Sequence, residues 1–345
     1  MRSKPPELPL RNQPQNLPRT YIDGALLPLA RDLVRRRGAA GLRVVFGSVP
    51  DTLSQLIRTA FVAAPGRTLV DADFSAIEAR MIAWLAGEEW VLEVFRTHGK
   101  IYEAAAAQMF GVPIETIRKG NPEYSYRQKG KVATLALGYQ GGVGSLVSMG
   151  ALRMGIPEED LPDIVERWRN ANPAIVQFWN TVEAAAREAV NTGRAIELWG
   201  GRLAFARELD PENDLDFLTI RMPNGRKLYY AKPHMGVNRF GRPSLCYWGM
   251  NQTTKKWEVV ETYGGKLAEN ITQAAARDCL AEAIDRLEAA GYPVVFHIHD
   301  EVVIDAPPGW DSLEEVIHIM RQVPHWAEGL PLKADGWVNP FFKKD

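Results

Sequence analysis

The sequence has few cysteines and no excess of charge of either sign. Cys246 and Cys279 are the only two cysteines in 345 residues, and they do not form a CxxC pair. A disulfide framework is therefore excluded, a zinc site is disfavoured and a reducing compartment is expected. Lys and Arg number 41 against 42 Asp and Glu, for a net charge of -1. This balance argues against a protein that binds nucleic acid by being basic throughout.

Targeting signals and uninterrupted apolar segments are also scarce. Residues 1–20 are rich in proline and polar residues, without the apolar core of a signal peptide, and predict an extended arm. The longest uncharged run, Val132–Leu152, is long enough to span a bilayer but contains five glycines and several polar residues. No membrane segment is expected. The apolar fraction of 46% is typical of a globular chain, and the length allows about two domains or one large enzyme fold.

Hydrophobic periodicity divides the chain into a mainly helical part, a β-rich part and a mixed end. The predicted helices cover residues 26–37, 51–61, 88–98, 101–110, 124–137 and 266–290, with another helix after residue 77 that makes 77–195 mostly helical. A buried strand is expected at 68–73. Short alternating runs predict strands between 195 and 263, where Asn224-Gly225 is a two-residue hairpin signal.

Three groups of residues have spacings suited to chemistry. In the first, Asp73 ends a buried strand and Glu78 follows about one helical turn later. A carboxylate in such a place is costly unless it is paired or binds a metal. The competing interpretation is that Asp73 or Ser75 caps the next helix.

The second group is His299-Asp300-Glu301, between two β-rich runs, which predicts a hairpin with an acidic tip. Adjacent carboxylates raise each other's pKa unless a cation lies opposite. A magnesium ion would supply that charge, because Mg²⁺ prefers oxygen ligands and commonly uses one or two carboxylates plus substrate phosphates. The alternative is a solvated turn with two surface acids.

The third group lies on the predicted helix 124–137. Arg127, Lys131 and Leu135 recur every four residues, so they share one face, and Tyr139 follows. Two cations followed by apolar groups suit a ligand with a polyphosphate at one end and a flat, partly apolar body at the other. The alternative is a solvated basic face. Together, the three groups supply the parts for metal-assisted phosphoryl transfer to a nucleic-acid 3′ hydroxyl.

In this order the motifs resemble those of family A DNA polymerases, the family of bacterial DNA polymerase I, and most of all its phage-type branch. Asp73–Arg80 is similar to motif A of the family, Arg127–Tyr139 to motif B and His299–Glu301 to motif C. The resemblance implies an α+β fold. A palm with a small antiparallel sheet would carry Asp73 and the motif C hairpin, and a helical fingers subdomain would be inserted.

The resemblance also implies a role for each site residue. Asp73 and Asp300 would hold two Mg²⁺ ions, which Mn²⁺ could replace, with help from the backbone carbonyl of Phe74 and with Glu301 in support. The dNTP would contact Arg127, Lys131, Leu135, Tyr139, Glu78 and Phe74, with Lys131 as general acid and Glu78 as the gate against a ribose 2′-hydroxyl. Primer-template DNA would contact Glu269, Gln273, Arg277, His299, Arg19 and Arg58. For the first three of these, an ordinary amphipathic helix is an equal alternative.

The resemblance divides the chain into four parts. These are an arm with the first part of the palm (1–76), mainly helical fingers (77–195), a β-rich insertion (196–265), and a palm helix with the motif C hairpin and C-terminal segment (266–345). Only 72 residues precede Asp73, so the thumb is expected to be largely absent, with a thumb, exonuclease or processivity partner supplied elsewhere. Such a core would bind DNA weakly and make short products. The expected location is the cytoplasm of a bacterium or phage-infected host.

Departures from the family pattern and two rival functions accompany this hypothesis. Leu135 replaces an aromatic residue of the family, and Gln140 replaces the glycine that follows the motif B tyrosine. The rivals are an enzyme similar to single-subunit RNA polymerases and a non-catalytic, DNA-binding homologue. The near-zero net charge conceals a segregated pattern compatible with DNA binding. Residues 1–60 hold ten Lys/Arg against four acids, whereas 278–315 hold ten acids and only Arg286.

Overall fold

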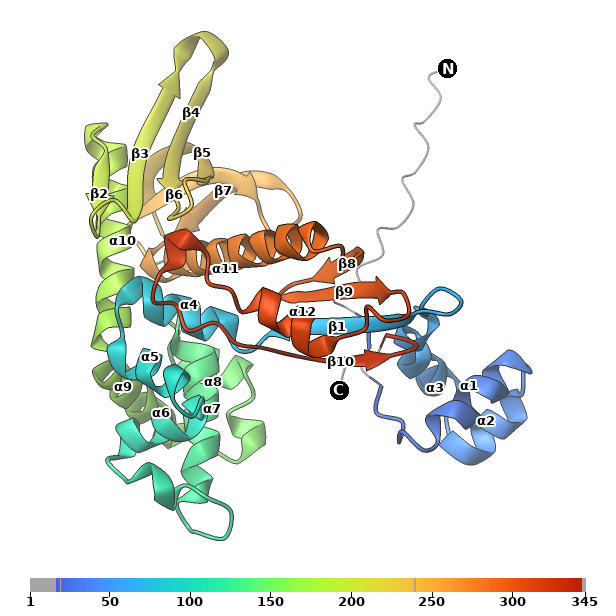
Figure 1. Ribbon diagram of the computed structural model, residues 1–345. Coiled ribbons are helices and arrows are strands. Elements are labelled where there is room, and N and C mark those ends of the chain that lie inside the picture. The colour runs from blue at the N-terminus through green and yellow to red at the C-terminus, as the bar shows by residue number, and fades with distance from the viewer. Residues whose placement is uncertain (1–16, 19, 239, 343–345) are drawn as a thin grey trace, which may run out of the picture. The chain divides into compact units, whose positions relative to one another are not determined.

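The computed structural model describes residues 17–18, 20–238 and 240–342, which fall into two compact units (Figure 1). The first unit takes the described residues of Met1–Ser75, Leu280–Gln322 and Lys333–Asp345. The second comprises Ala76–Cys279 and Val323–Leu332. The first unit is thus discontinuous in sequence. The helical segment 77–195 and the β-rich segment 196–265, which were predicted as separate parts, lie together in the second unit.

The first unit is built on a four-stranded antiparallel sheet in the order β10-β1-β9-β8. Its strands are β1 (Thr68–Phe74), β8 (Val294–Ile298), β9 (Glu301–Ala306) and β10 (Ala334–Asn339). Strands β1 and β9 are central and are the most deeply buried. The predicted strand and the predicted hairpin are both confirmed, and β1 joins them through its pairing with β9.

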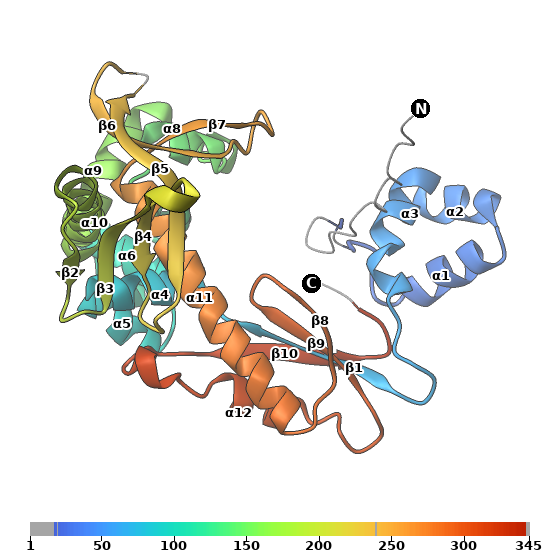
Figure 2. The ribbon, with the colours of Figure 1, turned by 90° about the horizontal axis from the view of Figure 1, so that it is seen from above.

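The two faces of this sheet differ in chemistry because successive side chains of a strand point to opposite faces. Ala72, Phe74 and Val302 belong to a buried apolar face. Helix α12 (Leu313–Met320) packs on β1 and β10 (Figure 2), and Gly336 permits its approach, because a Cβ there would lie 2.9 Å from Leu313 Cδ1. The opposite face is apolar at one end, around Leu69, Val303 and Phe342, and acidic at the other.

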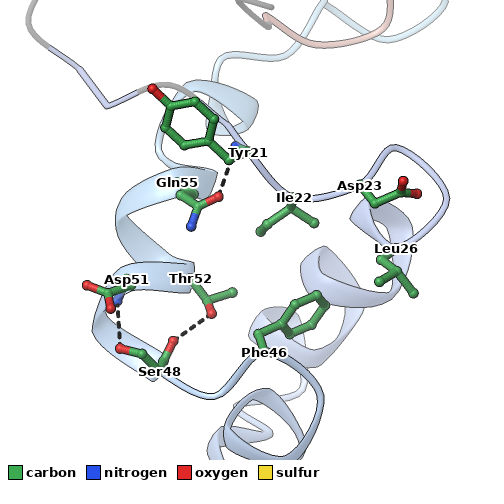
Figure 3. A pocket seen from close by; sticks show the side chains of 9 residues that line it. All are labelled: Tyr21, Ile22, Asp23, Leu26, Phe46, Ser48, Asp51, Thr52 and Gln55. Carbon is green, nitrogen blue, oxygen red and sulfur yellow. Dashed lines mark hydrogen bonds between the residues drawn. The ribbon is translucent and has the colours of Figure 1, made fainter. Parts of the chain in front are cut away.

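Three short helices precede the sheet: α1 (Leu27–Arg35), α2 (Ala39–Phe46) and α3 (Val49–Leu56). Helix α2 was not predicted, and α3 is shifted from the expected 51–61, because Ser48 caps its start by accepting a hydrogen bond from Asp51 N at 3.3 Å. A hollow of about 380 Å³ lies between α3 and the start of α1. Figure 3 shows its lining side chains, which include Phe46 and the acids Asp23 and Asp51.

The second unit confirms that segment 77–195 is mostly helical. Its helices are α4 (Ile77–Ala86), α5 (Glu89–Arg96), α6 (Ile101–Phe110), α7 (Tyr124–Leu137), α8 (Val143–Ser148), α9 (Leu161–Ala171) and α10 (Pro173–Thr192). A later helix, α11 (Gly264–Ala289), belongs to this unit as far as Cys279 and continues into the first unit. Helix α7 has the predicted bounds. Gly130 lets it lie close against α6, because a Cβ there would stand 2.3 Å from Tyr102 O. The glycine that weakens the isolated helix is therefore required by its packing.

The predicted β-rich segment forms a six-stranded antiparallel sheet in sequence order. Its strands are β2 (Ile196–Leu198), β3 (Leu203–Asp210), β4 (Leu215–Arg221), β5 (Lys227–Val237), β6 (Pro243–Met250) and β7 (Trp257–Thr262). The Asn224-Gly225 signal does mark a hairpin turn. The turn is longer than two residues, however, because Arg221 pairs with Lys227 and Met222 N donates to Arg226 O at 2.7 Å.

A buried carboxylate joins helices of the second unit. Glu88 precedes α5 and is 5% exposed. Its Oε2 accepts hydrogen bonds from Ala174 N at 2.9 Å and Ile175 N at 3.2 Å, at the start of α10. Burial raises the pKa of the Glu88 carboxyl, and the two backbone donors offset part of that rise. Glu88 therefore caps α10 at the cost of burying a charge.

We expect the stability difference between wild type and Glu88→Gln to depend on pH. The raised pKa means that the folded state takes up a proton more readily than the unfolded chain, so wild type gains stability as pH falls. The unfolding free energy of wild type relative to Glu88→Gln should rise from about pH 7 to about pH 4 in urea titrations. Exposed Glu115→Gln is the control for removing a negative charge. A constant difference would contradict this account.

Candidate active site

The pairing of β1 with its two neighbours gathers acidic residues on one face of the first sheet. Asp73 lies opposite Glu301 on β9 and opposite Asp335 on β10. Directly opposed residues project from the same face, so these three carboxylates are neighbours. Phe74 N donates to Asp300 O at 3.1 Å, which ties the end of β1 to the hairpin turn. The strand therefore brings Asp73 beside Asp300 and Glu301, 227 and 228 positions later in the sequence.

The β8–β9 turn has a conformation that the sequence did not indicate. Ile298 pairs with Glu301, so the turn consists of His299 and Asp300. His299 is exposed and has a φ of 52°, a left-handed value that costs a non-glycine residue about 1–2 kcal/mol. Glu301 is the first residue of β9 and is only 3% exposed. The expectations that it lies at the tip, or that both acids are surface groups, were therefore wrong for Glu301.

The helix-capping interpretation of Asp73 and Ser75 was also wrong. Helix α4 begins after Ala76, whose φ of 51° and methyl side chain provide a left-handed entry and no side-chain acceptor. Ser75 instead donates from Oγ to Asp335 Oδ2 at 2.9 Å, and Lys333 Nζ lies 3.6 Å from the same oxygen. Asp335 was not predicted as a site residue, although apolar and charged residues alternate from Leu332 to Asp335, a pattern that is typical of a strand.

This acidic face has the donor chemistry for a divalent ion. Within the described part of the chain, no group of three or more His, Cys, Asp or Glu side chains is arranged as a complete metal site. Mg²⁺, however, commonly uses one or two carboxylates and completes its shell with water and substrate phosphates. Asp73 and Asp300, on adjoining parts of the sheet, fit that requirement.

Two cations and an aromatic ring form a group on α6 and α7 in the second unit. Arg127 Nε donates to Glu103 Oε1 at 2.7 Å, and this hydrogen bond raises the pKa of the guanidinium. The Tyr102 ring lies 5.6 Å from Arg127 Cζ and 6.0 Å from Lys131 Nζ. The predicted Arg-Lys stripe is thus present, but Arg127 already has a carboxylate partner. An incoming phosphate must share it with Glu103 or displace Glu103.

The residue after α7 links three elements of the same unit. Tyr139 donates from its hydroxyl to Glu78 Oε2 on α4 at 2.9 Å. Gln273 on α11 approaches the other carboxylate oxygen of Glu78 at 3.5 Å. Burial, followed by the negative charge of Glu78, raises the pKa of Tyr139, so the phenol remains a proton donor. Leu135 is 47% exposed and leaves an apolar surface on α7.

Gln140 has a structural role that its sequence departure did not reveal. Its φ is 63°, and its Oε1 accepts a hydrogen bond from Gly265 N at 2.8 Å. Glu183 Oε2 accepts one from Gly264 N at 2.8 Å. These two side chains satisfy backbone donors at the start of α11. Gly265 fits there because a Cβ would lie 2.4 Å from Tyr139 O.

The predicted DNA contacts have different environments. Gln273 and Arg277 are exposed on one side of α11, whereas Glu269 is half-buried and pairs with Lys266 at 2.9 Å. Arg58 is 2% exposed and donates to Pro18 O at 3.0 Å and to Leu17 O at 2.7 Å. This burial contradicts a direct DNA contact for Arg58 and gives it a structural role. Arg19 lies outside the described residues.

Comparisons with known proteins agree with this architecture. The sequence model of DNA polymerase family A matches residues 47–215. A DNA polymerase of Bacillus phage SP02 is 52% identical over 96% of this chain and 50% of its own length. The thermostable DNA polymerase I of Thermus aquaticus is 25% identical over 79% of this chain and 26% of its own. The POL domain of Pol1 from M. smegmatis, in complex with DNA primer-template and dNTP, matches 84% of this chain and 42% of its own, with a TM-score of 0.53 and 20% identity.

The fold is thus that of a family A polymerase domain, and the chain belongs to DNA polymerase family A. The resemblance of its motifs and the expected α+β class are confirmed. The chain spans about half the length of the phage relative. Family A DNA polymerases generally use divalent metal ions. In the described residues, no helix is long and apolar enough to cross a membrane, and the Val132–Leu152 run is divided between α7, α8 and turns.

We expect Gln140→Ala to destabilise the second unit. The substitution removes the acceptor of Gly265 N, and a buried donor left without its partner costs about 1–3 kcal/mol. Chemical denaturation should show a loss of that size. Gln177→Ala is the control, because Gln177 is exposed and bonds only to the Thr181 side chain one turn later among the interactions described. Equal stability of the two variants would contradict the capping role.

Proposed function

We propose that this chain catalyses template-directed DNA synthesis, in which a dNTP is added to a primer 3′ hydroxyl and pyrophosphate is released. The observation that carries the proposal is the β1–β9 register, which brings Asp73 beside Asp300 and Glu301 on one face of a sheet. Membership of family A and the fold of a polymerase domain support it. The first unit would act as the palm, and the helical part of the second unit as the fingers.

The metal ligands proposed are Asp73, Asp300 and the backbone carbonyl of Phe74, with two Mg²⁺ ions that Mn²⁺ could replace. Such ions lower the pKa of the attacking hydroxyl and stabilise charge on the phosphates. Asp73 is half-buried at the end of a rigid strand, and Phe74 is held by its bond to Asp300 O. Glu301, buried beside Asp73, would keep the local potential negative and so favour cations.

The triphosphate would bind the cations of α7. Lys131 presents a point charge, and Arg127 a planar fork that a phosphate must share with Glu103. When the primer oxygen bonds to the α-phosphorus and the bond to the β-phosphate breaks, Lys131 would donate its proton to the departing pyrophosphate. Leu135 would contact the base through its exposed apolar surface, without the stacking energy of an aromatic ring.

Sugar selection is proposed for Glu78, with Tyr139 as its positioning partner. The hydroxyl of Tyr139 holds one carboxylate oxygen at 2.9 Å, so the side chain of Glu78 has a defined direction. A fixed carboxylate excludes a ribose 2′-hydroxyl by occupying its space. The primer-template would contact Gln273, Arg277, Glu269 and His299. A thumb, exonuclease portion or processivity factor would be further partners.

We expect Asp73→Asn and Asp300→Asn each to reduce primer extension by more than about a thousandfold, because metal ligation supplies several kcal/mol of transition-state stabilisation. Binding of primer-template should remain. Asp335→Asn is the matched control, since Asp335 lies on the same face but is 65% exposed and is bound by Ser75 and Lys333. It should lose less than about tenfold. Extension that survives Asp300→Asn would refute the proposed function.

We expect Glu78→Ala to weaken discrimination between dNTP and rNTP by about tenfold or more, because the carboxylate no longer occupies the space of the 2′-hydroxyl. Single-nucleotide incorporation with each substrate would give the ratio of kcat/KM values. Tyr139→Phe should produce a smaller loss, because it removes only the hydrogen bond that orients Glu78. An unchanged ratio in Glu78→Ala would remove Glu78 from sugar selection.

The same assay separates the two rivals. An RNA polymerase would incorporate rNTPs at least as well as dNTPs, whereas a non-catalytic homologue would bind primer-template without extending it. The names of the relatives favour DNA synthesis. Retention of Asp73 and Asp300 together with both cations of α7 favours catalysis over binding alone.

A further inference from the structure

The helical hairpin formed by α1 and α2 precedes the segment that matches the family model. The family match begins at residue 47, after α2 has ended at Phe46. The match to the phage polymerase covers 96% of the chain, so it extends through this hairpin. The hairpin is therefore shared with a phage relative and lies outside the part of the chain that matches the family model.

Exposed arginines are concentrated on this hairpin. Arg35 ends α1, Arg36 and Arg37 form the turn, and Arg43 lies on α2; all four are exposed. Arg36 pairs with Asp32 at 2.9 Å. Arg31, one turn before Arg35, stacks on the Phe341 ring at 4.2 Å. Its pKa is lowered by burial and by the charge of Arg35, so the end of α1 has cations crowded together.

Helix stability accounts for only part of this group. Cations in the last turn of a helix interact favourably with its dipole, which explains Arg35 and Arg36. Arg43 likewise lies in the last turn of α2, where it interacts with the dipole of that helix, whereas Arg37 follows α1 in the turn with a φ of 55°. An anionic partner explains all of these positions together.

We propose that the α1–α2 hairpin is a second DNA-contact surface, which binds the sugar-phosphate backbone of the double-stranded part of the primer-template. This inference rests on the proposed function. Arginine suits phosphate by its planar fork, and duplex DNA has the charge density that such a cluster complements. Single strands are bound through stacking on aromatic side chains. The only aromatic residue of the hairpin is Phe46, which lines the hollow in Figure 3, while its exposed large apolar residues are the aliphatic Leu29, Val44 and Val45.

The test compares two triple variants of the full chain. Arg35→Gln/Arg37→Gln/Arg43→Gln removes the proposed contacts and leaves Arg31 and Arg36 with their partners. The control, Arg194→Gln/Arg242→Gln/Lys256→Gln, removes three exposed cations of the second unit. Fluorescence anisotropy would measure the affinity for a labelled primer-template from about 50 to about 200 mM salt. Single-turnover extension at saturating DNA would be measured alongside.

The logarithm of the affinity falls linearly with the logarithm of the salt concentration, and each phosphate contact contributes about 0.9 to the steepness of that fall. We expect the slope of the hairpin variant to be shallower than that of wild type by up to about 2.7, for three lost contacts. Raising the salt from about 50 to about 200 mM should therefore weaken DNA binding by wild type about 40-fold more than it weakens DNA binding by the hairpin variant. The control should keep the wild-type slope. Extension at saturating DNA should remain within about twofold of wild type, which would show that the variant folds and that its catalytic residues are intact.

Three results would overturn the inference: a hairpin variant with the slope of the control, an equal loss for a single-stranded oligonucleotide of the same length, or a slope change with extension lost even at saturating DNA. Failure of the proposed function is a different outcome. In that case wild type itself would not extend the primer, although it could still bind it with the predicted salt dependence.

Discussion

The antiparallel pairing of β1 with β9 is the interaction on which the proposed chemistry depends. It joins residues 68–74 to residues 301–306 and so places Asp73 against the turn that holds Asp300. The register is fixed by burial, because Ala72, Phe74 and Val302 lie on one apolar face, which α12 covers at β1, and a slip of one residue would turn an acid into that face. Hydrophobic burial on one face thereby sets the position of charge on the other.

In the second unit, close backbone approach has a similar organising role. Gly130 allows α7 to pack on α6, where Tyr102 lies beside both cations. Gly265 allows α11 to begin against Tyr139, with Gln140 accepting its N–H. The Glu78–Tyr139 bond then connects α4 to the end of α7. The residues proposed to select the nucleotide are thus held by contacts among helices that lie far apart in sequence.

Much of this arrangement could be predicted from local sequence. The bounds of α7, the strand that ends near Asp73 and the β8–β9 hairpin follow from periodicity and turn residues. What local pattern could not provide depends on tertiary partners. Arg58 is buried against backbone carbonyls that sequence alone does not place beside it, Asp335 enters the acidic face only through the β1–β10 register, and Gln140 gains its function from the start of α11. Helix α2 was missed because it is short and contains Gly41.

The central claim is that the β1–β9 pairing makes Asp73 and Asp300 a joint site for divalent ions. Its most direct test is to count Mn²⁺ ions by electron paramagnetic resonance, with primer-template and a non-hydrolysable dNTP bound to wild type, Asp73→Asn and Asp300→Asn. The account predicts two bound ions in wild type and weaker binding in both variants, with Asp335→Asn unchanged. Equal Mn²⁺ binding by wild type and both variants would contradict it.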